Sequence, residues 1–357
     1  MAAPRSRRPS RLAVIRLLVG LVLLIAPLIA GELWIRGLIR DHRLPIAASH
    51  SGLFDQMWQR LHVGRAPDVL ILGDSVTQQD VDPATLAELV KAERGAPIRV
   101  FNAASAAAGF SLNRAILEQL IREGRAPKVI VLGVSTNSLE GDGAFLRDFA
   151  PSPLGGMITR CAETTSIDGW LSCRLANVSA LWRWHGRLDR VAFAVDHALP
   201  VRVRSASFVL RADGYGAWPP ATLDTIRGQV DRALSHEPET LRLASGVPDA
   251  FKRLVDVARG AGIPIVAVAM PTSPIYQDAL EARSPGYDAG RREGVAVLVA
   301  ASGQPIIDPL RFGSWWGDGS SRDVKHLSLE GAPKFVEQLW AMPEFRDGVL
   351  AGLAAGN

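Results

Sequence analysis

The sequence predicts an α/β protein whose parallel sheet is covered by helices on both faces, with a large insertion and an N-terminal transmembrane helix. Short runs of apolar, β-branched residues alternate with amphipathic helical segments before residue 140 and again after residue 246. One longer apolar segment lies within the first 35 residues. Hydrophobic residues make up 48% of the 357-residue chain and charged residues 21%, which excludes a disordered or collagen-like protein.

Five apolar runs are predicted strands of one sheet. They cover residues 68–72, 98–102, 128–133, 264–270 and 305–308. Five segments with apolar residues at helical spacing lie among them: 83–94, 111–123, 249–261, 287–301 and 329–340, the first with Asp82 as its expected N-cap. Continuous apolar strands alternating with helices are typical of a parallel sheet buried on both faces.

These elements predict a division of the chain into five parts. They are a basic tail (1–11), a transmembrane anchor (12–35), a stalk (36–67), an α/β domain (68–140 and 246–357) and an insertion or cap (141–245). The stalk contains one amphipathic stretch around Phe54, Met57, Trp58 and Leu61. Trp315 and Trp316, in a late Gly-rich loop, are expected to pack that loop.

The positive charge is concentrated at the N-terminus. The first 43 residues hold eight arginines and two acidic residues, a net charge of +6 in a chain whose total is +4. The rest of the chain therefore carries −2 and is nearly neutral. We expect no nucleic-acid partner for a domain without a basic surface.

Residues 12–35 reach the roughly 20 residues that a helix needs to cross a bilayer. Four arginines between residues 5 and 11 precede them, so the positive-inside rule predicts a cytoplasmic N-terminus with the domain on the far side. A cleaved signal peptide has the same charged start and apolar stretch. Leu28 and Ala30 do not give the small-x-small pattern of a cleavage site, which favours the anchor. Either interpretation exports the domain.

Cys161 and Cys173 are the two cysteines of the chain. In an exported protein this pair can close a short loop as a disulfide, whereas two unrelated buried thiols are the alternative. The cysteines and histidines lack the spacing of a metal site, and we expect neither a metal nor another cofactor.

Polar residues follow the first and the last predicted strands. Gly73, Asp74 and Ser75 come directly after the first strand, where a serine on a Gly-containing turn projects its hydroxyl above the sheet edge. Asp323 and His326 follow the last strand, and their spacing lets one local turn bring the carboxylate to the imidazole Nδ1. Carboxyl ends of parallel strands meet at one edge of the sheet. The pattern is that of a Ser-His-Asp arrangement for acyl transfer.

These two blocks are similar to those of the SGNH/GDSL hydrolase superfamily. Residues 69–75 match its Gly-Asp-Ser motif, and residues 323–332 match its Asp-x-x-His block and the helix after it. The resemblance implies a three-layer, flavodoxin-like parallel sheet, the SGNH hydrolase fold. It also implies Ser75 as nucleophile, His326 as general base and Asp323 as the partner of His326.

The middle blocks of the family match less closely. The family usually places a glycine after the second strand, whose N–H helps to form the oxyanion hole, and here Ala104 stands at the expected position. The third block normally reads Gly-x-Asn-Asp, and here Asn137 follows Gly133 at a longer distance without a following Asp. The expected hole consists of the Ser75 N–H, the Ala104 N–H and the Asn137 amide.

The anchor and the resemblance together suggest serine-dependent acyl transfer to an extracytoplasmic glycan, with an O-acetyltransferase as the leading hypothesis. The chain resembles membrane-tethered bacterial SGNH proteins that work with membrane-bound O-acyltransferases in polysaccharide O-acetylation. The expected partners are therefore a cell-envelope polysaccharide acceptor, an acyl donor and a membrane-bound O-acyltransferase. The expected location is the inner membrane, with one span and the catalytic domain in the periplasm.

Two alternatives remain open at this point. A carbohydrate or lipid esterase would use the same serine, histidine and aspartate with water as the acceptor. A non-catalytic glycan-binding or assembly subunit of an O-acylation complex would keep the fold without the reaction.

Overall fold

The computed structural model describes residues 11–40, 50–106, 108–141, 209–235, 237–309 and 311–355, together with a few short stretches between 167 and 182. Contacts divide the chain into two units, one containing Met1–Pro45 and Arg160–Leu199 and the other containing Ile46–Thr159 and Pro200–Asn357. The first unit contains helix α1, and the second contains the α/β domain. Cys161 and Cys173 lie outside the described residues, so the predicted disulfide is not addressed.

Helix α1 (Arg11–Arg40) contains the predicted anchor. Its segment Val19–Arg36 is long and apolar enough to cross a membrane, and only 6% of that segment is buried. Polar residues near its end bind a short part of the predicted insertion: Glu32 accepts a hydrogen bond from the Leu181 N–H (2.8 Å), and Arg36 donates one to the Val178 carbonyl (2.7 Å).

Five parallel strands form the central sheet of the α/β domain. They are β1 (Val69–Leu72), β2 (Val100–Asn102), β3 (Val129–Val134), β6 (Ile265–Ala269) and β7 (Ile306–Ile307). Their order across the sheet is β2-β1-β3-β6-β7, and every pair is parallel. Numbered along the chain within this sheet, the order is 2-1-3-4-5, which is that of flavodoxin-like doubly wound sheets. Such sheets bind ligands at the carboxyl ends of the strands where the order reverses, here between β1 and β3.

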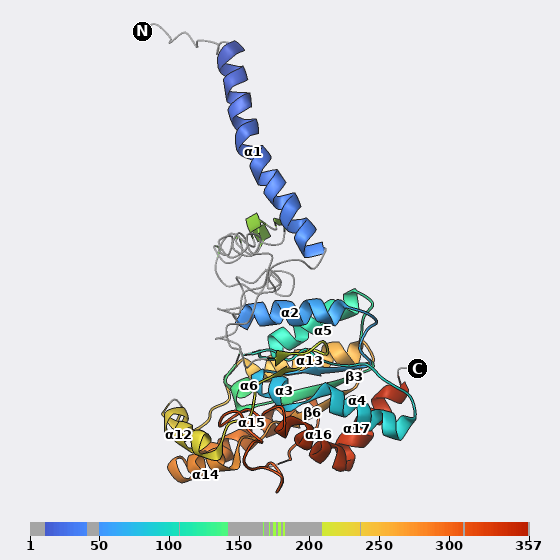
Figure 1. Cartoon of the computed structure of the whole chain (residues 1–357), viewed down its shortest axis with the longest axis vertical. Coiled ribbons are helices and arrows are strands. Elements are labelled where there is room, and N and C mark those ends of the chain that lie inside the picture. The colour runs from blue at the N-terminus through green and yellow to red at the C-terminus, as the bar shows by residue number, and fades with distance from the viewer. Residues whose placement is uncertain are drawn as a thin grey trace. The chain divides into compact units, whose positions relative to one another are not determined.

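Helices cover both faces of this sheet. The side chains of each strand point alternately to the two faces, so each face has its own hydrophobic cluster. Leu70 and Leu72 of β1 join one hydrophobic cluster, whereas Val69 and Ile71 join the other. Figure 1 shows α2, α5 and α13 on one side and α4, α16 and α17 on the other. Their bounds are α2 (His50–His62), α5 (Phe110–Arg122), α13 (Val247–Gly260), α4 (Pro83–Arg94), α16 (Gly331–Ala341) and α17 (Pro343–Ala355).

Several of these helices begin and end as the sequence indicates. Asp82 caps α4 by accepting a hydrogen bond from the Ala84 N–H (3.1 Å), which confirms the predicted N-cap. Pro83 occupies the first turn, where its missing N–H costs nothing, and Gly95 ends the helix in the left-handed conformation (φ 71°).

The α/β domain is larger than the sequence predicts. Phe54, Met57, Trp58 and Leu61 of α2, expected in a stalk, are buried in the cluster that contains α5 and α13. Burial of these apolar side chains makes α2 part of the domain.

Part of the predicted insertion also belongs to this domain. It contains the hairpin β4 (Val209–Leu210) with β5 (Gly216–Ala217) and helix α12 (Leu223–Leu234). Ile226, Val230 and Leu234 of α12 are buried in the same cluster as α2.

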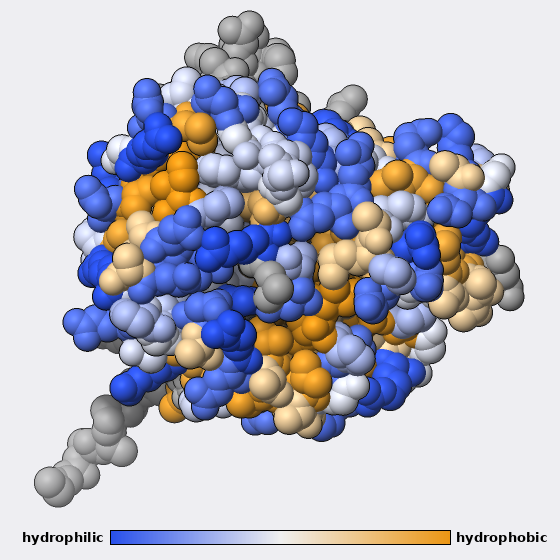
Figure 2. Space-filling view, turned by 90° about the horizontal axis from the view of Figure 1, so that it is seen from below, coloured by the Kyte–Doolittle hydropathy of each residue, from blue (hydrophilic) through white to orange (hydrophobic). Residues whose placement is uncertain are grey.

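Two further helices follow β6: α14 (Pro274–Arg283) and α15 (Tyr287–Ser302), of which α15 packs against α13. Figure 2 shows the molecule from below relative to the view of Figure 1, and this surface carries mainly hydrophilic residues interspersed with smaller hydrophobic groups. Such a mixture is ordinary for a globular domain.

Candidate active site

Ser75 lies at a sharp turn between β1 and a short helix, α3 (Ser75–Asp80). Gly73 has a φ of 150°, and a Cβ there would lie 2.2 Å from Thr77 Oγ1, so only glycine fits. Asp74 caps α3 by accepting a hydrogen bond from the Val76 N–H (3.0 Å). Asp74 and Val76 are buried, whereas Ser75 is partly exposed at the carboxyl edge of the sheet. The turn therefore presents the Ser75 hydroxyl, as predicted.

Asp323 and His326 lie in the loop between β7 and α16. One oxygen of Asp323, Oδ1, accepts hydrogen bonds from the backbone N–H groups of Lys325 and His326, both at 2.9 Å. The imidazole Nδ1 of His326 lies 2.9 Å from Oδ1 and 3.0 Å from Oδ2 of the same carboxylate. The local turn expected from the spacing of these two residues is present.

The turn that carries Ser75 (the serine turn) and the loop that carries Asp323 and His326 (the histidine loop) meet at the carboxyl edge of the sheet. His326 Nε2 lies 3.1 Å from Ser75 Oγ, across 251 positions of sequence. With the Nδ1 proton donated to Asp323, Nε2 accepts the hydrogen bond of the Ser75 hydroxyl. The predicted convergence of the two segments is confirmed.

Electrostatics favour an ionised Asp323. Burial by itself raises the pKa of this carboxyl, but hydrogen bonding to His326, the charge of His326, the Lys325 N–H and the charge of Arg322 together lower it to about 2. Arg322 Nε lies 3.7 Å from Asp323 Oδ2. A carboxylate that stays charged at neutral pH is suited to orienting an imidazole and to stabilising its protonated form.

Asp74 connects the serine turn to the next strand. Its Oδ2 accepts a hydrogen bond from the Ser135 hydroxyl, and Ser135 is the N-cap of α6 (Thr136–Glu140) at the end of β3. Burial raises the pKa of Asp74, opposed by the hydrogen bond from Ser135, the charge of His326 and backbone N–H groups. Asn137 lies in the first turn of α6 and is partly exposed, so the structure places it one strand away from Ser75 at the same sheet edge.

The predicted oxyanion donors differ in their availability. Among the described residues the Ser75 N–H has no hydrogen-bond partner, as is usual for the first residue of a helix. Ala104, by contrast, is fully buried, and its N–H donates to Asn102 Oδ1 (3.0 Å). Ser105 then donates its N–H to the Gly73 carbonyl (3.1 Å), which holds this loop against the serine turn. The Ala104 amide is thus engaged within the protein, which the sequence did not predict.

Asn102 is a buried residue that sequence reasoning did not single out. It ends β2, and its Nδ2 lies within hydrogen-bonding distance of the carbonyls of Thr77 (3.3 Å), Gln78 (3.3 Å) and Val81 (3.0 Å). It therefore ties the end of α3 to the sheet while its Oδ1 holds the Ala104 loop. A polar residue at the end of an apolar strand was the available sequence signal.

Glu237 is a second residue that the sequence analysis did not single out, and it contacts the loop that carries His326. Glu237 accepts hydrogen bonds from the hydroxyls of Tyr276 (2.7 Å) and Tyr287 (3.1 Å), and it forms an ion pair with Lys325. Burial acts to raise the pKa of Glu237, but Lys325 and the two tyrosines lower it overall. Through Glu237, Lys325, the residue next to His326, is therefore connected to Tyr276 of α14 and Tyr287 of α15.

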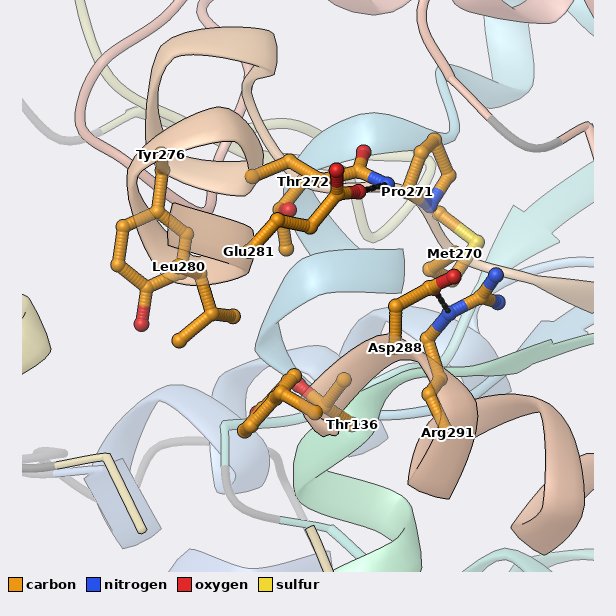
Figure 3. Close-up of a pocket in the computed structure, with 11 residues that line it drawn as sticks. Thr136, Met270, Pro271, Thr272, Tyr276, Leu280, Glu281, Asp288 and Arg291 are labelled. Carbon is orange, nitrogen blue, oxygen red and sulfur yellow. Dashed lines mark hydrogen bonds and ion pairs between the residues drawn. The ribbon is translucent and has the colours of Figure 1, made fainter. Parts of the chain in front are cut away.

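A pocket lies farther along the same edge, at the carboxyl ends of β3 and β6 (Figure 3). Thr136 lines it from α6, Met270 from the end of β6 and Leu280 from α14, and Ser75 and His326 are not among its lining residues. Arg291 also lines it and is paired with Asp288 (3.0 Å) and Asp308 (3.1 Å). Among the described residues, no group of three or more His, Cys, Asp or Glu side chains could hold a metal ion.

The two loop tryptophans pack within the protein. Trp315 donates its indole N–H to Gln338 Oε1 (3.0 Å) and lies 5.5 Å, between ring centroids, from Phe312. Trp316 donates to Ser321 Oγ (2.8 Å). Both contacts agree with the predicted packing of this loop.

Comparison of the chain with family models, with curated proteins and with solved structures found no match.

Proposed function

We propose that this chain is an SGNH-type serine acyltransferase that transfers acyl groups, most simply acetyl, to an extracytoplasmic glycan. The observation that carries the proposal is the continuous arrangement of Ser75, His326 and Asp323. The two hydrogen-bonding contacts, 3.1 Å to Ser75 and 2.9 Å to Asp323, place a base next to a hydroxyl and a carboxylate behind the base. This is the arrangement that activates a serine for attack on an ester.

In the first step the Ser75 hydroxyl gives its proton to His326 Nε2 as Oγ forms a bond to the carbonyl carbon of the acyl donor. The Ser75 N–H and the Asn137 amide are the donors proposed for the oxyanion. Ala104 can contribute only after its N–H leaves Asn102. The bond to the leaving alcohol then breaks, His326 returns the proton to the leaving oxygen, and an acyl-serine remains.

In the second step an acceptor hydroxyl attacks the acyl-serine. His326 takes the acceptor's proton, the bond between Ser75 and the acyl carbon breaks, and the proton returns to Ser75. A glycan hydroxyl as acceptor makes the protein a transferase, and water makes it an esterase.

The apolar helix supports the choice of a glycan acceptor. Val19–Arg36 can span a membrane, and the arginines before α1 favour a cytoplasmic N-terminus. The domain then lies in the periplasm, tethered to the inner membrane, where cell-envelope polysaccharides pass. The resemblance of residues 69–75 and 323–332 to the SGNH/GDSL superfamily extends this to partnership with a membrane-bound O-acyltransferase that supplies acyl groups.

One observation favours a second candidate, a non-catalytic glycan-binding or assembly subunit. The Ala104 N–H, one of three expected oxyanion donors, is engaged by Asn102. A chain that had lost the reaction would have no need to keep this amide available.

Covalent labelling with a fluorophosphonate distinguishes an activated serine from an inert one. We expect the full-length chain in detergent to be labelled at Ser75, and the Ser75→Ala variant not to be labelled. Ser235, an exposed serine whose hydroxyl binds the Arg232 carbonyl, provides the control, because Ser235→Ala should label normally. If the wild-type chain is not labelled, the proposal that it is a serine-dependent enzyme is wrong.

Transfer is tested on the same protein. With p-nitrophenyl acetate as donor and de-O-acetylated cell-envelope oligosaccharides as acceptors, mass spectrometry should detect acetylated sugar. Release of acetate alone, with every acceptor tried, identifies an esterase.

A further inference from the structure

Asp80 is a buried carboxyl group whose position the reaction does not explain. It is the last residue of α3 and has no exposed surface. Its Oδ1 accepts a hydrogen bond from the Leu327 N–H at 2.7 Å, whereas its Oδ2 has no hydrogen-bond partner among the described residues. Burying a carboxyl group with one oxygen unpaired is costly, so the position of Asp80 calls for an explanation.

The geometry suggests an explanation, because Asp80 connects the segments that carry Ser75 and His326. Helix α3 begins with Ser75 and ends with Asp80, and the residue that Asp80 holds comes directly after His326. The same helix therefore carries the nucleophile at one end and the attachment point of the base at the other. Asp80 and Leu327 are 247 positions apart in the sequence, so this hydrogen bond is a long-range connection.

Helix α3 is well fixed for such a task. Its carbonyl groups bind the Asn102 amide, and the Gln79 carbonyl also accepts a hydrogen bond from the Tyr215 hydroxyl (3.0 Å). Thr77 packs between Gly73 and Gly133, where any Cβ would clash with it. A loop attached to α3 is consequently attached to the sheet.

The surroundings of Asp80 favour its neutral form. Burial raises the pKa of Asp80 well above its usual value; the Leu327 N–H opposes this, and the negative charges of Asp323 and Asp74 raise it further. Tyr215, whose pKa burial also raises, is the other titratable group that interacts with this carboxyl. A neutral carboxyl still offers a carbonyl oxygen to Leu327.

We propose that Asp80 is a positioning residue for the acyl-transfer site, holding the Leu327 N–H so that His326 Nε2 stays within hydrogen-bonding reach of Ser75. This inference rests on the proposed function, since it assigns Asp80 a part in aligning that same pair. Asp80 touches neither substrate nor the reacting atoms. Its contribution is to keep the imidazole where proton transfer can occur.

Two substitutions of similar size separate the acceptor oxygen from the carboxyl group itself. Asp80→Asn keeps a carbonyl oxygen for Leu327 and resembles the neutral acid, so the rate of fluorophosphonate labelling at Ser75 should stay within about threefold of wild type. Asp80→Leu removes the acceptor and should slow labelling by about 10- to 100-fold, the effect of a small misplacement of a catalytic group. For p-nitrophenyl acetate, Asp80→Leu should lower kcat while KM changes by less than about threefold.

A nearby aspartate controls for a general loss of structure. Asp82 is also buried and caps α4, and among the described residues the hydrogen bonds and ion pair of its side chain join it to Ala84, Thr85 and Arg211 rather than to the histidine loop. Asp82→Ala should lower the melting temperature and leave the labelling rate of the folded protein within about threefold of wild type. Equal slowing in Asp82→Ala and Asp80→Leu would overturn the proposal, and so would slow labelling of Asp80→Asn or normal labelling of Asp80→Leu.

Amide hydrogen exchange tests the attachment without any activity. The Leu327 amide should be protected in wild type and in Asp80→Asn and should exchange at least tenfold faster in Asp80→Leu. If the wild-type chain is not labelled at Ser75, the proposed function fails while this exchange experiment still decides whether Asp80 holds the loop. Equal protection in all three proteins would show that it does not.

Discussion

At the scale of single residues, the candidate site depends on contacts of two kinds. Asp323 and His326 are three positions apart, and one turn of backbone is enough to join them, so their contact followed from the spacing. Ser75 and His326 are 251 positions apart, and only the pattern of strands placed them at one edge. Asp80 gave no comparable signal, because a polar residue at a helix end usually has a local role. Asn102 offered only its place as a polar residue at the end of an apolar strand.

The charge on Asp323 should matter more than its size. Asp323→Asn can still hydrogen-bond to His326, but it favours the wrong tautomer and does not stabilise the imidazolium, so kcat/KM for p-nitrophenyl acetate should fall by about 10³- to 10⁴-fold. Stopped-flow or steady-state absorbance measures this loss. Asp318→Asn, an exposed position in the same loop whose carboxylate binds the Leu223 N–H, should stay within about twofold of wild type. An unimpaired Asp323→Asn would contradict the assigned role.

The raised pKa of Asp80 predicts a pH-dependent stability difference. A carboxyl whose pKa is higher in the folded state contributes stability that is fully present below its unfolded pKa of about 3.9 and is lost as the pH rises through the folded pKa. Asp80→Asn removes this titration. Its free energy of unfolding relative to wild type should therefore increase with pH above about 4, by at most about 1.4 kcal/mol per pH unit.

Urea unfolding at several pH values between 4 and 8, followed by tryptophan fluorescence, measures this difference. Asp74, Asp323 and Tyr215 interact with Asp80 and titrate in both proteins, so the comparison isolates Asp80 to first order. Parallel stability curves for the two proteins would show that Asp80 does not titrate in this range.

At the scale of elements, α3 packs against β1 and β3 directly after the carboxyl end of β1. The sequence predicted the strands on both sides and the serine after β1, but not this six-residue helix, whose short polar sequence carries no helical periodicity. The Thr77 side chain packs against Gly73 and Gly133. Because neither glycine has a side chain, α3 can pack this close to the ends of β1 and β3.

Gly133→Ala tests this fit. The added Cβ would lie 1.9 Å from Thr77 Oγ1 in a buried site, so we expect a loss of about 1–3 kcal/mol in unfolding free energy and slower fluorophosphonate labelling of Ser75. Urea unfolding and labelling kinetics measure the two effects. Gly228→Ala is the matched control, since a Cβ added to that exposed glycine of α12 would have no packing neighbour within 4 Å, and it should stabilise the protein by about 0.5–1 kcal/mol. Equal effects of the two substitutions would show that the packing of Thr77 between Gly73 and Gly133 does not matter for stability or labelling.

Helix α17 was also missed by the sequence analysis, for a different physical reason. Helix α17 contains Gly348 and Gly352, which lower its intrinsic helix propensity. In the structure these glycines lie against the sheet, where a Cβ on Gly352 would come 2.7 Å from the Cβ of Val129. A residue that weakens the helix locally is thus required by packing that the local sequence does not reveal.

At the scale of the whole molecule, helix α1 and the α/β domain differ in how they expose apolar side chains. The domain buries its apolar side chains in two clusters, whereas Leu23 and Leu24 of α1 are 70% and 67% exposed. Exposed apolar side chains over this length are stable in lipid and unfavourable in water.

Two lysines in α1 should release the chain from membranes. Leu23→Lys with Leu24→Lys places two charges near the middle of the apolar segment, each costing about 2.5–3.5 kcal/mol on insertion. The fraction of protein that resists alkaline carbonate extraction should fall from nearly all to a minority. Val63→Lys, at a 68% exposed apolar residue of the α/β domain, should leave that fraction unchanged. Full retention of the double variant would exclude α1 as the anchor.

The amino-acid sequence alone was enough to predict the features whose information is local: the five strands, the cap of α4, the glycine turn that presents Ser75, and the turn that joins Asp323 to His326. The folded chain was needed to learn how far His326 lies from Ser75, that Asp80 holds Leu327, and that Asn102 ties the end of α3 to the sheet. The first group depends on dihedral angles and periodicity within a few residues. The long-range contacts in the second depend on the order of strands and on side chains packing across the whole sheet, which no short stretch of the sequence contains.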